Sequence, residues 1–138
     1  AAVAMVLVGK SSDRSGERYW HIIISAWVAA FGFWLSSENP GSIVIALTGI
    51  TIASAGVLSA ISLSWSLPTA YLSGTAAAAG IAMINSIGNL SGFVSPTLVG
   101  WIKDVTGSLS GGLYMLSGSI AGAGLMVLVA YLMRHKRA

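Results

Sequence analysis

The 138 residues of this chain are 55% hydrophobic and only 8% charged, whereas soluble domains carry about 25% charged residues. This composition predicts an all-α integral membrane protein, with room for four spans but not for an added soluble domain. The absence of cysteine excludes disulfides and thiolate metal sites. The net charge of +3 is clustered, which indicates membrane topology rather than nucleic-acid binding, and we expect no nucleic-acid partner.

Apolar segments separated by polar turns set out the expected elements in chain order. The first run, residues 1–9, is too short to span, and we interpret it as the end of a helix whose beginning is missing. The polar segment 10–20 follows as a loop. The full spans are expected at residues 21–37, 43–67, 76–102 and 113–133, followed by the tail 134–138.

Two basic clusters lie at the ends of this series of spans. They consist of Lys10, Arg14 and Arg18, and of Arg134, Lys136 and Arg137. Basic clusters mark the cytoplasmic side of membrane proteins. Four crossings place both clusters on the same side, so we expect the loop 10–20 and the C-terminus to be cytoplasmic in a bacterial inner membrane.

The span 43–67 carries a stripe of small and hydroxylic residues that we expect to face the bundle interior. The stripe consists of Thr48, Thr51, Ala55, Ser59, Ser62 and Ser66. These hydroxyls either line a cavity or bond only to carbonyls of their own helix. Trp65, which flanks the stripe near Pro68, is either an interface anchor or a cavity wall.

The span 76–102 is predicted to have a packed side and a wet side. Its ridge of small residues allows close approach of a neighbouring helix, and it consists of Gly80, Gly88, Gly92, Pro96 and Gly100. Asn85 and Asn89 form a second ridge about 100° away. Their amides need polar partners or a water-filled cavity, and a bond to a neighbouring helix is the structural alternative. In the last span, Gly118 and Gly122 are expected to pack within the domain.

Two segments resemble the major facilitator superfamily. The sequence GKSSDRSGER, residues 9–18, resembles the G-x-x-S-D-R-x-G-E-R element that joins the eighth and ninth helices of that superfamily. The sequence LPTAYLSGTAAAAGIAMINSIGNLSGFVSP, residues 67–96, is similar to its anion:cation symporter branch, and so is GWIKDVTG, residues 100–107. That branch includes carriers of phthalate, tartrate, galactonate and similar organic acids. The resemblance covers the whole chain, but only about the last third of such a carrier.

The resemblance implies a major-facilitator-type helical bundle that works by alternating access, with the substrate site between two six-helix halves. This chain would be a C-terminal fragment, a partial C-terminal half comprising the end of helix eight and helices nine to twelve. Its partners would be the missing N-terminal half, membrane lipid, a small organic anion and the proton as coupling ion, without a cofactor. The implied function is secondary active transport of a sugar acid, dicarboxylate or aromatic acid by proton symport.

The resemblance also assigns substrate contacts residue by residue. The matching positions at the end of the tenth helix and on the eleventh are Ser62, Ser64, Trp65 and Asn85, with Asn89 one turn further as the next candidate. On a regular helix Ser64 points about 160° away from the hydroxyl stripe. It would still reach the cavity if the backbone unwinds before Pro68.

The loop motif has a gating role in the family. Asp13 would hold the cytoplasmic side shut by pairing with an arginine and with the positive N-terminal end of a neighbouring helix. Gly16 would permit the tight turn, while Arg14 and Arg18 would face the loop and the lipid headgroups. A solvated loop without a gating part is the alternative.

No charged residue lies inside any expected span, because Glu38, Lys103 and Asp104 fall in turns. A proton-coupled carrier needs an intramembrane titratable group, and an anion site usually needs a cation. The family places both in its first half. The alternatives are a self-standing four-helix membrane protein, either a small exporter or a scaffold, and a non-functional truncated carrier. We expect no enzyme, because no nucleophile with a base in reach, phosphate loop or metal cluster is present.

Overall fold

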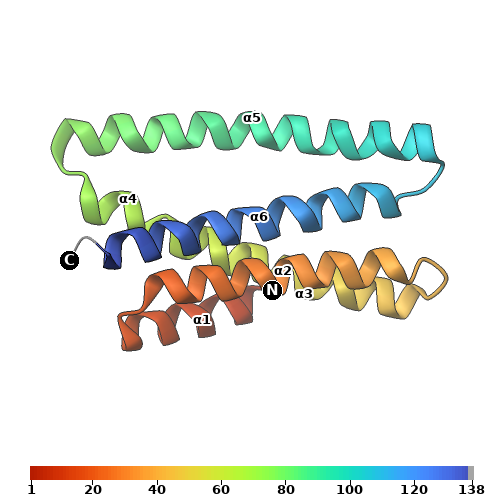
Figure 1. Ribbon diagram of the computed structural model, residues 1–138, viewed down its shortest axis with the longest axis horizontal. Coiled ribbons are helices and arrows are strands. Elements are labelled where there is room, and N and C mark those ends of the chain that lie inside the picture. The colour runs from red at the N-terminus through yellow and green to blue at the C-terminus, as the bar shows by residue number, and fades with distance from the viewer. Residues whose placement is uncertain (137–138) are drawn as a thin grey trace.

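The computed structural model describes residues 1–136, and the regular structure of that range is entirely helical (Figure 1). The helices are α1 (Ala2–Ser15), α2 (Arg18–Glu38), α3 (Ile43–Ser64), α4 (Ser66–Tyr71), α5 (Gly74–Thr106) and α6 (Ser110–His135). The segments long and apolar enough to cross a membrane are Arg18–Glu38, Ile43–Tyr71, Gly74–Thr106 and Ser110–His135. The predicted all-α membrane bundle is thereby confirmed. Arg137 and Ala138, the end of the basic tail, lie outside the described residues.

The junction between α1 and α2 is shorter than the loop predicted for residues 10–20. Helix α1 continues through the polar residues to Ser15, and α2 begins at Arg18. The apolar start of α1 nucleates a helix that can extend through polar residues at little cost. It ends at Gly16, whose φ of 69° is left-handed and therefore suits glycine. The prediction of a loop over 10–20 is wrong, and only Gly16 and Glu17 separate the two helices.

The second membrane-capable segment is interrupted earlier than expected and continues further. Helix α3 ends at Ser64, a single turn residue follows at Trp65, and α4 carries the chain on to Tyr71. Pro68 lies in the first turn of α4, where its missing N–H removes no helical hydrogen bond. The span therefore does not stop at Pro68, and the break falls three residues before it.

Helices α2 and α3 touch backbone to backbone. A Cβ atom on Gly32 would lie 2.4 Å from the backbone nitrogen of Ala53, and one on Gly56 would lie 2.6 Å from the carbonyl oxygen of Ser25. Such close approach is possible only between small residues. The small buried residues at this contact include Ser25, Ala29, Gly32 and Ser36 of α2 and Gly49, Ala53 and Gly56 of α3.

Apart from Gly80, where a Cβ atom would lie 2.6 Å from the Leu72 side chain, the glycine ridge of the third span does not pack within the described part of the chain. Cβ atoms at Gly88, Gly92 and Gly100 would have no neighbouring atom within 4 Å. No residue of α5 is buried, and Figure 1 shows this helix along one edge of the bundle beside α6. Gly118 and Gly122 of α6 are equally open. Within residues 1–136, the predicted close packing along these glycines is wrong, because the close contact is between α2 and α3.

Most hydroxyls of the stripe that begins on α3 donate hydrogen bonds to backbone carbonyl oxygens of their own segment. The hydroxyls of Thr48, Thr51 and Ser59 donate to the carbonyl oxygens four residues before them, at 2.7–2.8 Å. Of the residues in the stripe, only Ser59 is buried. The expectation that the whole stripe faces the bundle interior is therefore wrong, because back-bonding lets these side chains remain at the surface.

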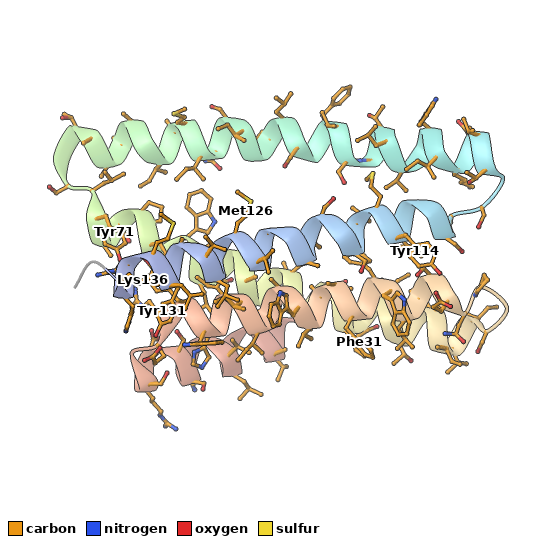
Figure 2. All side chains as sticks on the ribbon, viewed as in Figure 1. Phe31, Tyr71, Tyr114, Met126, Tyr131 and Lys136 are labelled. Carbon is orange, nitrogen blue, oxygen red and sulfur yellow. The ribbon has the colours of Figure 1, made fainter. Side chains whose placement is uncertain are left out.

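Helix α6 is joined to the other side of α2. The Ser117 hydroxyl donates to the carbonyl oxygen of Ala30 at 2.8 Å, and the Tyr114 hydroxyl donates to Glu38. A Cβ atom on Gly124 would lie 2.8 Å from the indole ring of Trp27. Figure 2 shows Tyr114 at one end of the bundle, with Tyr71 and Tyr131 at the other. Helix α2 is therefore the centre of the bundle, with α3 and α6 packed against it.

Replacing Gly32 by alanine should lower the free energy of unfolding by about 1–3 kcal/mol, because the added methyl group must push two backbones apart. The measurement is thermal unfolding of the purified protein in detergent. Gly122→Ala, which adds a methyl group to open space, is the matched control and should not be destabilised. Equal melting temperatures for all three proteins would contradict the backbone contact between α2 and α3.

Ser117→Ala should lower the free energy of unfolding by about 0.6 kcal/mol, and by at most about 1.7 kcal/mol, as is typical of hydrogen bonds between membrane helices. Ser119→Ala serves as control, because the Ser119 hydroxyl bonds only to Met115 of its own helix. Both variants would be compared by denaturant unfolding in detergent. A larger loss for Ser119→Ala would show that Ser117 does not link α6 to α2.

Candidate functional site

A cavity of about 550 Å³ lies between the α3–α4 junction and α5. Its lining is largely apolar with a few polar groups, which is typical of a small-molecule site. The lining residues are Ile61, Ser64, Trp65, Leu67, Pro68, Ile84, Asn85, Gly88 and Ser91. The end of one membrane-spanning segment and the first half of the next therefore form its two walls.

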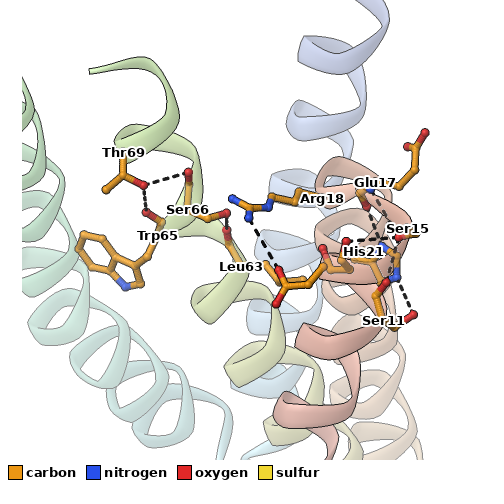
Figure 3. A network of polar contacts seen from close by, with 11 residues as sticks. Ser11, Ser15, Glu17, Arg18, His21, Leu63, Trp65, Ser66 and Thr69 are labelled. Carbon is orange, nitrogen blue, oxygen red and sulfur yellow. Dashed lines mark hydrogen bonds and ion pairs between the residues drawn. The ribbon is translucent and has the colours of Figure 1, made fainter. Parts of the chain in front are cut away.

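Local structure explains how the polar groups come together. The backbone stays close to helical at Trp65, with φ of −62° and ψ of −22°, and Figure 3 shows the Trp65 ring directed towards α5. On α5, Asn85, Gly88 and Ser91 recur at steps of three, so they share one face of the helix. The step-of-three spacing from Asn85 is the signal by which Gly88 and Ser91 could have been found in the sequence.

The hydrogen bonds already made in the cavity decide what each polar group can offer a ligand. The Ser64 hydroxyl donates to Ala60 and the Ser91 hydroxyl donates to Gly88, each at 2.7 Å. A hydroxyl has one proton to donate, so both serine oxygens are left as acceptors. Within residues 1–136, the Asn85 amide and the Trp65 indole N–H make no hydrogen bond. These two groups are the donors available to a ligand.

The predicted substrate contacts separate into two groups in the structure. Ser64, Trp65 and Asn85 line the cavity together, whereas Ser62 and Asn89 are not part of its lining. All five residues are exposed. None of the lining residues is charged. The cavity can therefore orient a polar ligand, but it offers no full charge to balance that of an anion.

The motif at the α1–α2 junction forms a compact turn held by its own polar contacts (Figure 3). Asp13 pairs with Arg18, with 3.7 Å between carboxylate oxygen and guanidinium nitrogen. Arg18 is the first residue of α2, so the carboxylate lies beside the positive end of that helix. His21 bonds through Nδ1 to the Glu17 carbonyl at 2.6 Å and through Nε2 to the Ser11 hydroxyl at 3.1 Å. The gating hypothesis requires that Asp13 pairs with an arginine, as it does here with Arg18. The Arg14 side chain is exposed.

A second polar cluster links three helices at the same end of the bundle. Arg134 of α6 donates to the hydroxyl oxygens of Tyr71 on α4 and Tyr19 on α2, the latter at 3.4 Å. The two tyrosine hydroxyls are 2.9 Å apart, and the Tyr19 ring lies 5.7 Å from that of Tyr131. From the sequence, Arg134 is only a signal of membrane topology. Three helices that converge in space leave no pattern in the spacing of residues along the chain.

The four membrane-capable helices form a membrane bundle with a cavity that suits a small molecule, and known transport proteins are similar to this chain. A protein of Agrobacterium vitis named as a tartrate transporter is 47% identical over 94% of this chain. NicT of Pseudomonas putida, named as a metabolite transport protein, is 37% identical over 87%. A quinolone resistance transporter of Acinetobacter baumannii is 36% identical over 83%.

The chain belongs to the major facilitator superfamily, as its two motifs indicated. It spans 28% of the length of the tartrate transporter and of NicT, and 26% of the quinolone resistance transporter. No family model and no solved structure matches the chain. The relatives are transporters, which confirms that the chain is not an enzyme.

Proposed function

We propose that this chain is part of a secondary active transporter that moves small organic anions by alternating access and proton symport. The main supporting observation is the uncharged cavity at the α3–α4 junction, where Asn85 and Trp65 offer donors in a chain from a transporter superfamily. Its proposed partners are the remaining helices of the carrier, the lipid of a bacterial inner membrane, the transported anion and the proton.

The polar groups of the cavity favour a hydroxy acid as the substrate. Asn85 and Trp65 can donate to carboxylate or hydroxyl oxygens, while Ser64 and Ser91 can accept hydrogen bonds from substrate hydroxyls. A relative named as a tartrate transporter fits this substrate class. Because no lining residue is charged, the cation that balances the carboxylate and the proton-binding group are proposed to lie in the rest of the carrier.

The arrangement of charges supports the proposed topology. The α1–α2 turn and the end of α6 lie together, since Gly16, Arg18, Arg134 and His135 line one small cavity. Basic residues from both clusters of the sequence therefore meet at one end of the bundle. We propose that this end faces the cytoplasm, and that the pair of Asp13 and Arg18 helps to hold that side of the carrier closed.

Asn85→Ala in the intact carrier should reduce uptake about ten-fold or more, because a hydrogen bond to a charged group contributes about 1.5–3 kcal/mol. Uptake of tartrate, galactonate and phthalate would be measured in proteoliposomes with and without an inward proton gradient. Asn89→Ala, on the same helix but outside the cavity lining, should leave uptake within about two-fold of the parent. Uptake indifferent to Asn85 would place the substrate elsewhere, and failure to carry any acid would contradict the proposed substrate class.

Asp13→Asn should slow transport by about two- to five-fold, because an exposed ion pair contributes up to about 1 kcal/mol to the closed state. Initial uptake rates would be compared at equal abundance in the membrane. Glu17→Gln is the control, because Glu17 is adjacent but forms no ion pair within residues 1–136. Unchanged rates for Asp13→Asn would leave the turn as a solvated connection without a gating part.

A further inference from the structure

Gly88 occupies a position that helix packing does not explain. It lies in the wall of the α3–α4/α5 cavity, between Asn85 and Ser91, and a Cβ atom there would meet no atom within 4 Å. Gly32 is the opposite case, because a Cβ atom there would strike the backbone of α3. Among residues 1–136, nothing therefore requires Gly88 to lack a side chain.

The backbone does not explain Gly88 either. Helix α5 runs through this position without interruption, and among residues 1–136 positive φ occurs only at Gly16, Gly74 and Gly107. In the middle of a helix, alanine is preferred to glycine. The glycine thus weakens the helix locally, and the space that it leaves open is space in the cavity.

We infer that Gly88 sets the upper limit on the size of the acid that the cavity accepts, which makes it a specificity-determining residue. This inference rests on the proposed function. Asn85 is one turn away on the same wall and holds the polar end of the substrate, while the bare backbone at Gly88 leaves room for the remainder. The acids that a side chain at this position would exclude first are therefore the longest hydroxy acids and those that carry a ring.

The chain provides a matched control at Gly92. A Cβ atom at Gly92 also meets no atom within 4 Å, and Gly92 lies one turn further along α5, outside the cavity lining. If the glycine ridge serves only to pack against another part of the carrier, substitutions at Gly88 and Gly92 should act alike. If Gly88 determines size, the two positions should differ.

The experiment compares the intact carrier with its Gly88→Ala, Gly88→Leu and Gly92→Ala variants in proteoliposomes. A series of hydroxy acids from four to six carbons, together with phthalate, would be tested for uptake and for competition. In Gly88→Ala, uptake of the largest accepted acids should fall about ten-fold or more relative to the smallest, since one added methyl group can discriminate by that factor. Gly88→Leu should lower the size limit further, whereas Gly92→Ala should keep the parent's order of preference.

An unchanged size limit in both Gly88 variants would overturn the inference, as would an equal shift in Gly92→Ala. Thermal unfolding in detergent provides the folding check, and Gly88→Ala should melt no lower than the parent because alanine favours the helix. A parent carrier that takes up none of these acids would overturn the proposed function and this inference together. That outcome differs from a parent that transports acids with a size limit independent of Gly88.

Discussion

The structure depends on the backbone contact between α2 and α3. Lipid tails are as apolar as leucine side chains, so hydrophobic burial does not drive helices together within a membrane, and close packing and hydrogen bonds must do so. Gly32 and Gly56 provide that packing where the two helices cross. With α3 fixed in this way, its C-terminal end is held opposite α5, where Ser64 and Trp65 line the cavity.

The chemistry of the cavity is suited to releasing a ligand as well as binding it. Neutral donors and acceptors can orient a polar ligand through several moderate hydrogen bonds, and none of these bonds involves a charged group of the cavity wall. Two serine protons are already committed to helix carbonyls, so these side chains need not reorganise when the ligand leaves. A carrier must bind and release in every cycle, and a neutral wall favours both steps.

The spans could be predicted from the sequence because hydropathy depends on composition alone, and the family could be predicted because its motifs are contiguous. The helix–helix contacts could not be predicted. Small residues recur at helical spacing in several spans, and spacing alone does not show which stripe meets a partner. The ridge at Gly88, Gly92 and Gly100 was therefore expected to pack, while the contact at Gly32 was missed. Likewise, Asn85 and Asn89 are the same residue type one turn apart, and only the three-dimensional position of the α3–α4 break distinguishes them.

Arg134 gives the end of the chain a structural importance that its position would not suggest. Its guanidinium group holds Tyr71, the last residue of α4, and α4 begins beside the cavity at Ser66. The final turn of α6 thus supports the far end of a cavity wall through one side chain. For protein engineering, this means that trimming back into α6 would remove the contact between Arg134 and α4, and would leave α4 with its contacts to α3 and α5.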